Sequence, residues 1–150
     1  MEINAKDYIV YDAKGRVLGR VASAAAKAAL RGKKIAIINA GDAIISGNKK
    51  DIIKKYNTRL RLQEKANPEH SPYWSRRPDM LMKRVIRGML PYRKASGKSA
   101  YRRLLVFTGT PEIFKEAKIE DIRFKGKDGM YVKSIKLSEL SRLLGYRTKA

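Results

Sequence analysis

Apolar and polar positions in the first third of the chain change period twice. Residues 8–12 have the length and composition of a short strand, whereas residues from about 17 to 31 place apolar side chains on one helical face and charged side chains opposite. Residues 35–38 form a continuous apolar run, which is typical of a strand buried on both faces. A strand, a helix and a buried strand in this order predict a parallel β-α-β unit.

The middle of the chain combines helical patterns with a short alternating one. Asn48 can cap a helix that runs to about Tyr56, and residues 58–63 alternate Leu with Arg or Gln, which predicts a half-buried strand with a basic outer face. Residues 66–77 contain two prolines and no periodicity, so we expect a loop. A helix should follow, with Pro78 at its first position.

The next segment continues the alternation of strands and helices. After a loop through residues 96–97, the sequence predicts a short basic helix and then a strand at 104–107. Residues 108–111 are expected to turn into a further helix, which Thr110 caps and Pro111 starts.

The C-terminal part ends in a helical pattern. Residues 124–130 are expected to form a loop rich in Gly and Lys, and Ser138 can cap a helix that Gly145 ends. The apolar stripe of this helix comprises Leu137, Leu140 and Leu144. The whole pattern favours a single domain, residues 1–150, in which α/β layers pack on a mostly parallel sheet.

Composition excludes several classes of function. The chain has no Cys and one His, His70, which excludes disulfides, thiolate nucleophiles and a cysteine or histidine cluster for a metal, so no cofactor is expected. The N-terminus lacks the pattern of a signal peptide, and no apolar run approaches the roughly 18 residues of a membrane span. We therefore expect a soluble intracellular protein that is not an enzyme.

The positive charge is concentrated in the middle of the chain. Residues 48–103 hold 17 Lys or Arg against 4 Asp or Glu, which gives +13 of the total net charge of +21. A polyanion, above all a nucleic-acid backbone, is the natural counter-charge of such a region. We therefore expect about residues 48–103 to form the surface that faces a nucleic acid.

In the helix that Pro78 begins, cations and apolar residues lie on separate faces. Lys83, Arg84 and Arg87 occupy an arc of about 100° opposite the apolar side, and no acidic residue after Asp79 offsets them. A solvated charged face is the alternative interpretation. Because cation clusters of this kind follow polyanion backbones, we expect these three residues to bind phosphates.

The loop at 66–77 places two aromatic residues, Tyr73 and Trp74, beside Arg76 and Arg77. Rings can stack on unpaired bases while guanidinium groups reach phosphates, a combination that fits RNA better than duplex DNA. Alternatively, Trp74 is an anchor that holds the loop on the core. The sequence leaves both roles open.

Two glycine patterns are weak signals for a nucleotide site. Gly15 and Gly19 lie between a strand and a helix but lack the G-x-G-x-x-G spacing, and residues 41–49 do not match G-x-x-x-x-G-K-[ST]. A helix N-terminus with Lys49 and Lys50 in its first turn can still offer N–H groups to an RNA phosphate.

Several motifs closely resemble the ribosomal protein L-thirteen family of the large subunit. The matching segments are residues 12–23 (DAKGRVLGRVAS), Ile38-Asn39-Ala40, Ser46-Gly47-Asn48-Lys49, Arg87-Gly88-Met89-Leu90-Pro91, and the positions Gly97, Ala100, Leu104, Val106, Phe107, Gly109 and Pro111. The resemblance covers about residues 7–111. The loop from Asn67 to Pro78 resembles the archaeal and eukaryotic branch, so an archaeal source is expected.

The resemblance implies a three-layer α/β/α fold with a mostly parallel four-stranded sheet, contact with large-subunit rRNA and neighbouring large-subunit proteins, and a role in early subunit assembly. It also implies a cytoplasmic location, at the ribosome. The basic and aromatic residues expected to bind RNA are Arg16, Arg20, Lys49, Lys50, Arg59, Arg61, Tyr73, Trp74, Arg76, Arg77, Lys83, Arg84, Arg87, Lys94, Lys98, Arg102 and Arg103.

Two other classes of function stay open from the residues alone. One is a nucleotide-binding enzyme on a similar α/β scaffold, although a phosphate-binding loop and a catalytic pair are lacking. The other is a free-standing regulatory RNA binder or a DNA-compacting protein. Stabilisation by a nucleotide would favour the first class, and a preference for DNA or absence from ribosomes would favour the second.

Overall fold

The computed structural model describes residues 4–120, 122 and 133–147. In chain order its strands and α-helices are β1 (Tyr8–Asp12), α1 (Leu18–Leu30), β2 (Lys34–Ile38), β3 (Ile44–Ser46), α2 (Lys49–Arg61), α3 (Pro78–Gly88), α4 (Ala95–Arg102), β4 (Leu104–Val106), β5 (Ser134–Lys136) and α5 (Leu137–Leu143). Short 3-10 turns lie at Ala5–Asp7, Ala40–Asp42, Pro68–His70 and Glu112–Phe114. The loop expected at 124–130 lies outside the described residues.

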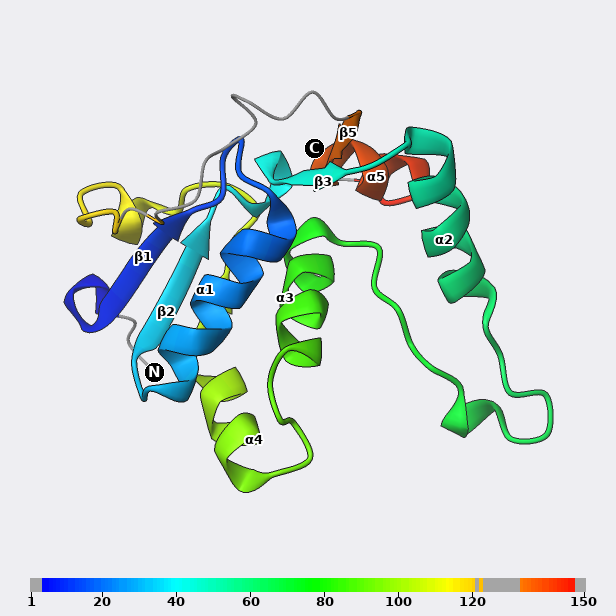
Figure 1. The fold of residues 1–150 in the computed structure, drawn as a ribbon, viewed down its shortest axis with the longest axis horizontal. Coiled ribbons are helices and arrows are strands. Elements are labelled where there is room, and N and C mark those ends of the chain that lie inside the picture. The colour runs from blue at the N-terminus through cyan, green and yellow to red at the C-terminus, as the bar shows by residue number, and fades with distance from the viewer. Residues whose placement is uncertain (1–3, 121, 123–132, 148–150) are drawn as a thin grey trace.

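The strands β1, β2 and β4 form a parallel sheet with β2 in the centre (Figure 1). Ile35 of β2 pairs with Ile9 of β1 and with Leu104 of β4. Because α1 connects β1 to the parallel strand β2, the predicted β-α-β unit is confirmed. Gly32 follows α1 with φ of +89°, a backbone conformation that glycine adopts without strain.

The central strand β2 is buried on both faces, as its continuous apolar sequence predicts. Ile35 and Ile37 belong to the main core, to which α1, α3 and α4 contribute. Ala36 and Ile38 belong to a smaller core with Phe114 on the other face. Figure 1 shows α1, α3 and α4 on one side of the sheet. The sheet therefore lies between a layer of helices and the segment around Phe114.

The expected four-stranded, three-layer arrangement is not confirmed, because the parallel sheet has three strands in the described part of the chain. At the outer edge of β1, Val10 makes a single bridge with Ile119. The strands β3 and β5 form a separate antiparallel pair. The helix expected from Pro111 is a 3-10 turn at Glu112–Phe114, in which Phe114 is buried and Ile113 is 53% exposed.

The strand expected at 58–63 is wrong, because α2 continues through Arg61. The alternation there covers only two Arg-Leu repeats, and Leu and Arg are good helix formers, so the preceding helix simply extends. Ile52 and Tyr56, one turn apart, are buried on the core side. The extension places Arg59 one turn beyond Tyr56 on the same side of the helix.

The helix α4 begins earlier than expected. A loop was expected through Ser96-Gly97, but the helix starts at Ala95 and Gly97 is buried in its first turn. A Cβ atom on Gly97 would lie 2.1 Å from the carbonyl oxygen of Pro91 and 2.9 Å from the nitrogen of Tyr92. The glycine is therefore required for close packing of α4 against the chain before it.

The helix α5 confirms the predicted apolar stripe, since Leu137, Leu140 and Leu144 are buried. The predicted cap is wrong by two residues, because Lys136 occupies the N-cap and Ser138 lies in the first turn. Gly145, with φ of +90°, follows the helix as expected. Within the described ranges, no helix has the length and apolar character that a membrane span requires.

Candidate nucleic-acid interface

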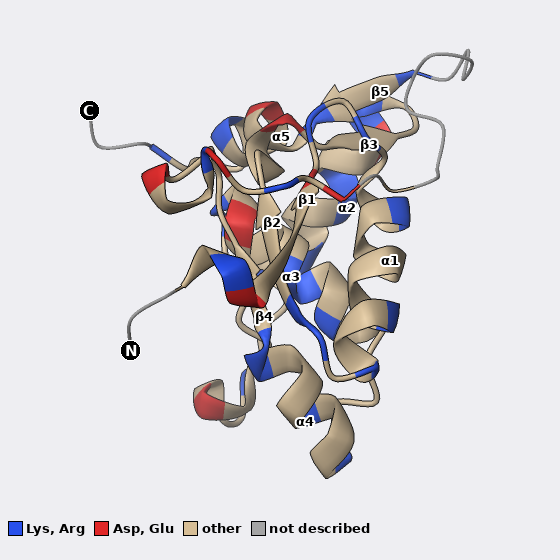
Figure 2. Ribbon diagram, turned by 90° about the vertical axis from the view of Figure 1, so that its left-hand side faces the viewer, with Lys and Arg blue, Asp and Glu red and all other residues tan. Residues whose placement is uncertain are grey.

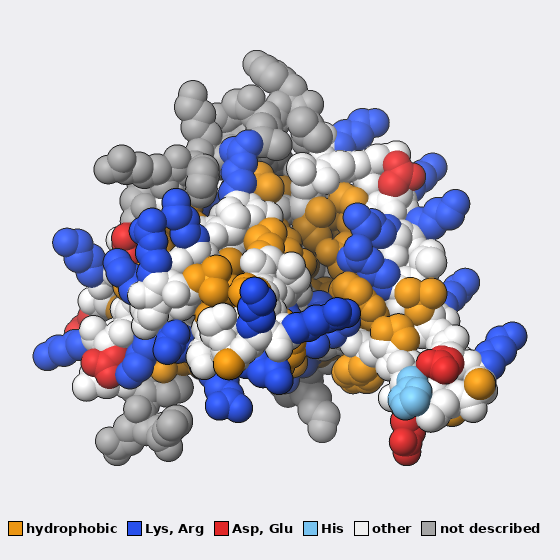
Figure 3. All heavy atoms as spheres, turned by 60° about the horizontal axis from the view of Figure 1, so that its bottom comes forward, with side chains coloured by type: hydrophobic (Ala, Val, Ile, Leu, Met, Phe, Trp, Pro, Cys, Tyr) orange, Lys and Arg blue, Asp and Glu red, His pale blue; other side chains and the backbone are white. Residues whose placement is uncertain are grey.

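The basic segment forms one side of the molecule, made of α2, residues 62–77, α3 and α4. After α2 the chain runs away from the sheet and returns alongside α3 (Figure 1). The ribbon in Figure 2 shows Lys and Arg distributed over α1, α3 and α4. In Figure 3, Lys and Arg side chains spread over the face that comes forward, whereas Asp and Glu lie toward its rim. This face therefore carries many cations, with hydrophobic and uncharged side chains between them.

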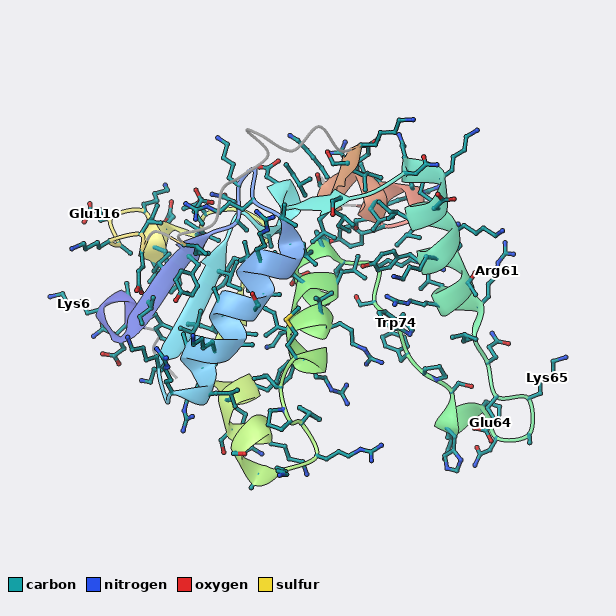
Figure 4. The ribbon with its side chains drawn as sticks, viewed as in Figure 1. Lys6, Arg61, Glu64, Lys65, Trp74 and Glu116 are labelled. Carbon is teal, nitrogen blue, oxygen red and sulfur yellow. The ribbon has the colours of Figure 1, made fainter. Side chains whose placement is uncertain are left out.

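Trp74 connects α2 to α3. The guanidinium carbons of Arg59 in α2 and Arg84 in α3 lie 4.8 and 4.7 Å from the centroid of its ring. Arg59 also lies 5.3 Å from the ring centroid of Tyr56, which is buried in the core. Figure 4 shows Trp74 on the chain that passes between α3 and α2. Each cation–π contact contributes about 0.5–1 kcal/mol at an exposed site, so one ring restrains two guanidinium groups.

Two tyrosines hold the other cations of α3. The guanidinium carbon of Arg87 lies 4.1 Å from the ring centroid of Tyr92, and Nζ of Lys83 lies 5.0 Å from that of Tyr101. The two rings meet edge to face with their centroids 5.3 Å apart. Every cation of α3 that was predicted to bind phosphate therefore rests on an aromatic ring.

An open groove of about 460 Å³ lies beside Trp74 and is lined by Arg59, Trp74, Arg84, Val85, Arg87, Gly88 and Tyr92. We call it the basic groove. Within the described residues, none of its three arginines forms an ion pair with a carboxylate. Because no internal carboxylate neutralises them, these guanidinium groups remain available to an external anion.

Lys83, like the groove arginines, is half-buried. Burial lowers the pKa of Lys83 from its ordinary value, and the carboxylate of Asp79 acts in the opposite direction. Burial also raises the pKa of Tyr56 and of Tyr101 above the ordinary value of a phenol. These phenols therefore stay neutral at physiological pH and support the cations as uncharged rings.

Arg77, Lys49 and Arg16 are predicted RNA-binding cations that have hydrogen-bond or carboxylate partners inside the chain. Arg77 donates two hydrogen bonds, of 3.1 and 2.7 Å, to the carboxylate of Asp79 at the start of α3. Nζ of Lys49 lies 2.5 Å from a carboxylate oxygen of Glu139 in α5. Arg16 donates a hydrogen bond of 2.8 Å to the carbonyl oxygen of Ile122. These three cations therefore also stabilise contacts of the fold itself.

The remaining predicted residues lie at or near the surface. Arg103 is half-buried, and the exposed ones are Arg20, Lys50, Arg61, Tyr73, Arg76, Lys94, Lys98 and Arg102. The ring of Tyr73 is 84% exposed and is accessible for stacking, whereas Trp74 is half-buried against two arginines. The ring of Trp74 contacts arginines of α2 and α3, so its two predicted roles, an anchor on the core and a base-stacking ring, both stay open.

The tyrosines that hold the cations were not predicted from the sequence. Tyr56 precedes Arg59 by three residues, a spacing that signals contact only if this segment is a helix, and a strand was expected there. Tyr92 and Tyr101 are brought together by the turn into α4 and the packing of that helix. No local spacing in the sequence reveals such a contact.

The C-terminal part supports the basic segment at three points. β5 pairs with β3, the strand directly before α2. Glu139 of α5 pairs with Lys49 in the first turn of α2. The hydroxyl of Ser141 donates a hydrogen bond of 2.5 Å to the carbonyl oxygen of Arg76, just before α3. Both chain segments that flank the basic groove are therefore attached to the C-terminal part.

Among residues 4–120, 122 and 133–147, no group of three or more His, Cys, Asp or Glu residues is placed to hold a metal ion. His70 is exposed in the loop after α2. The fold and the site together define a small basic α/β protein equipped to bind a polyanion.

Comparison with known proteins identifies the family. Residues 6–113 match the family model of ribosomal protein L13. The chain is 38% identical to the large ribosomal subunit protein uL13 of Methanopyrus kandleri over 148 residues, which cover 97% of this chain and 91% of the relative. The uL13 protein of Archaeoglobus fulgidus is 40% identical over 94% of this chain and 90% of the relative. The uL13 protein of Methanocaldococcus jannaschii is 43% identical over 91% of this chain and 96% of the relative. The chain belongs to the ribosomal protein L13 family.

This membership confirms the resemblance found in the sequence, including its archaeal character, since these relatives are archaeal. The family consists of structural ribosomal proteins, so the chain is not an enzyme. The place of the family is the cytoplasmic ribosome. Although the family model ends at residue 113, the similarity to the relatives extends over 91% or more of the chain.

Proposed function

We propose that this chain is a structural constituent of the large ribosomal subunit, that it binds large-subunit rRNA through its basic face, and that it supports early subunit assembly. Residues 1–150 act in this role as one domain. The observation that carries the proposal is the basic groove, where Arg59, Arg84 and Arg87 rest on aromatic rings without carboxylate partners in the described structure. The names of the archaeal relatives support the subunit.

The physical argument for RNA starts from charge. A segment with a net charge of +13 repels itself, and a polyribonucleotide backbone relieves that repulsion while counterions are released. Guanidinium groups suit phosphate because they form paired hydrogen bonds with two of its oxygens. The groove arginines and the exposed cations around them therefore form one surface, with the exposed ring of Tyr73 at its side.

We propose that all 17 residues predicted from the sequence belong to this surface, and that most of the cations have one of two roles. Arg59, Arg84 and Arg87, with the exposed cations, contact RNA directly. Arg16, Lys49 and Arg77 contribute mainly to the field, because each also has a partner inside the chain. Neighbouring large-subunit proteins are expected to cover other parts of the surface.

RNA binding is expected to depend strongly on salt. If about six cations each neutralise a phosphate, the logarithm of the association constant should fall against the logarithm of salt concentration with a slope of magnitude roughly 4 to 5. Fluorescence anisotropy with a labelled large-subunit rRNA fragment, repeated at several salt concentrations, measures this slope. A complex whose affinity does not change with salt contradicts the proposed mode of binding.

The role in the large subunit is tested by sedimentation. A native lysate is separated on sucrose gradients at low and high salt, and the chain is detected in the fractions. It should sediment with large subunits and intact ribosomes at both salt concentrations. Detection only at the top of the gradient would reject a ribosomal role and would favour a free regulatory RNA binder. A shift of the melting temperature with ATP, GTP or NAD would instead revive nucleotide binding.

A further inference from the structure

No described contact within the chain requires a glycine at position 88. It is the last residue of α3, it is exposed, and a Cβ atom built on it meets nothing within 4 Å. Its backbone is not in the left-handed region, unlike Gly15, Gly32, Gly47 and Gly145. Glycine in a helix is less stable than alanine, and the open space at Gly88 leaves room for a close approach from outside.

The position of Gly88 indicates that a ligand would approach it from the basic groove. Gly88 lines the basic groove together with Arg84 and Arg87 from the same helix and Arg59 from α2. A ligand in the groove would therefore lie against bare backbone at Gly88 while guanidinium groups surround it. This is the arrangement in which a missing side chain lets a phosphate backbone come close.

The size of the groove and its aromatic walls favour single-stranded over double-stranded RNA as the ligand. Its volume of about 460 Å³ lies in the range of sites that hold one small molecule, so it can enclose a single nucleotide unit, whereas a double helix can only lay one of its backbones along it. Its walls also include the rings of Trp74 and Tyr92. Rings beside cations are typical of sites that bind single strands without reading their sequence.

Trp74 holds two of the groove arginines in place before any ligand binds. Its ring contacts Arg59 and Arg84, whose helices are otherwise separate parts of the basic segment. A planar guanidinium held against a ring loses less conformational freedom when it binds phosphate. Trp74 therefore acts on the ligand through two arginines, which makes it a positioning residue.

We propose that the basic groove holds one unpaired strand of RNA, whose backbone passes over Gly88 with its phosphates at Arg59, Arg84 and Arg87, and that Trp74 positions two of these arginines. The inference rests on the proposed rRNA binding and adds the form of the RNA and the part of the surface that takes it. It separates the groove from the surrounding exposed cations, which attract any RNA regardless of form.

The first test places a side chain in the groove. Gly88→Leu is compared with Gly109→Leu, because Gly109 is also exposed, has open space around it and lies outside the groove lining. Affinities are measured by anisotropy for a mixed-sequence single-stranded RNA oligonucleotide and for the same sequence as a duplex. Gly88→Leu should weaken single-strand binding about tenfold or more, the size of one lost stacking or phosphate contact, and duplex binding much less.

The outcomes of this test are distinct. Equal single-strand affinity for Gly88→Leu and the wild type overturns the inference, and so does an equal loss for single-stranded and duplex RNA. The Gly109→Leu protein should bind both RNAs as the wild type does. If the wild type binds neither RNA, the proposed function itself fails, which is a different result from a loss confined to Gly88→Leu.

The second test isolates the positioning role of Trp74 with a double-mutant cycle. Arg84→Lys keeps the charge but removes the planar group that stacks on the ring. It should lower single-strand affinity in the presence of Trp74 and lower it less in a Trp74→Ala background, where the ring that holds Arg84 is gone. The salt slope should stay the same throughout, because no charge is removed. Equal effects of Arg84→Lys in both backgrounds would contradict the positioning role.

Discussion

Gly97→Ala is expected to lower the free energy of unfolding by about 1–3 kcal/mol, the usual cost of forcing extra atoms into a packed site. The added Cβ would lie 2.1 Å from the carbonyl oxygen of Pro91 and 2.4 Å from its carbonyl carbon. Both are backbone atoms that cannot rotate away, so α4 or the preceding turn must shift. Urea or thermal unfolding followed by circular dichroism measures the loss.

The matched control for this prediction is Gly109→Ala, since Gly109 has open space where its Cβ would lie and no left-handed φ. That variant should unfold close to the wild type. A shift at residues 91–92 would also move Tyr92 away from Arg87, so the Gly97→Ala protein should bind RNA more weakly at temperatures where it is still folded. Similar unfolding curves for the two alanine variants would show that α4 does not pack as described.

Charge reversal at Arg84 and Arg87 together is expected to weaken RNA binding more than it weakens the fold. Each lost hydrogen bond between a charged side chain and phosphate removes about 1.5–3 kcal/mol, and the new carboxylates repel the backbone. The salt slope should fall by about two, one for each phosphate contact removed. The two lost cation–π contacts limit the decrease in unfolding free energy to about 1–2 kcal/mol.

The control for the charge reversal is the double change Lys6→Glu and Lys118→Glu. It alters the net charge by the same amount at exposed positions outside the predicted RNA-binding set. Lys6 lies at the left-hand edge of the view in Figure 4, on the other side of the sheet from Trp74. If both double variants lose equal affinity, net charge alone governs binding. A loss of stability in the Arg84 and Arg87 variant that matches its loss of affinity would mean that these arginines mainly hold the fold.

The parts of the fold that could be predicted from the sequence are those where one physical signal dominates. The run Ile35–Ile38 has no polar position, so a strand buried on both faces is the simplest solution, and α1 combines a helical period with Gly32 after its end. The strand predicted at residues 58–63 is wrong because a short alternation competes with helix propensity there. The helix that begins before them extends into this segment.

The charged residues of the site could be predicted from the sequence, but the aromatic residues that hold them could not. The segregation of Lys83, Arg84 and Arg87 on α3 follows from helical period and was visible in the sequence. Their aromatic partners come from the loop before the helix and the turn and helix after it, so the contacts depend on tertiary packing. Gly97 illustrates the same limit, because a glycine needed for close packing looks like a loop residue when only its neighbours in sequence are known.

The attachment of the C-terminal part to both sides of the basic groove has a consequence for synthesis. β5, Glu139 and Ser141 secure the start of α2 and the approach to α3, yet they are synthesised after every residue that lines the basic groove. The β-α-β unit can form early, from the first 38 residues. The groove therefore gains these three supports only after residues 134–141 have been made, so a shorter nascent chain presents its cations without them.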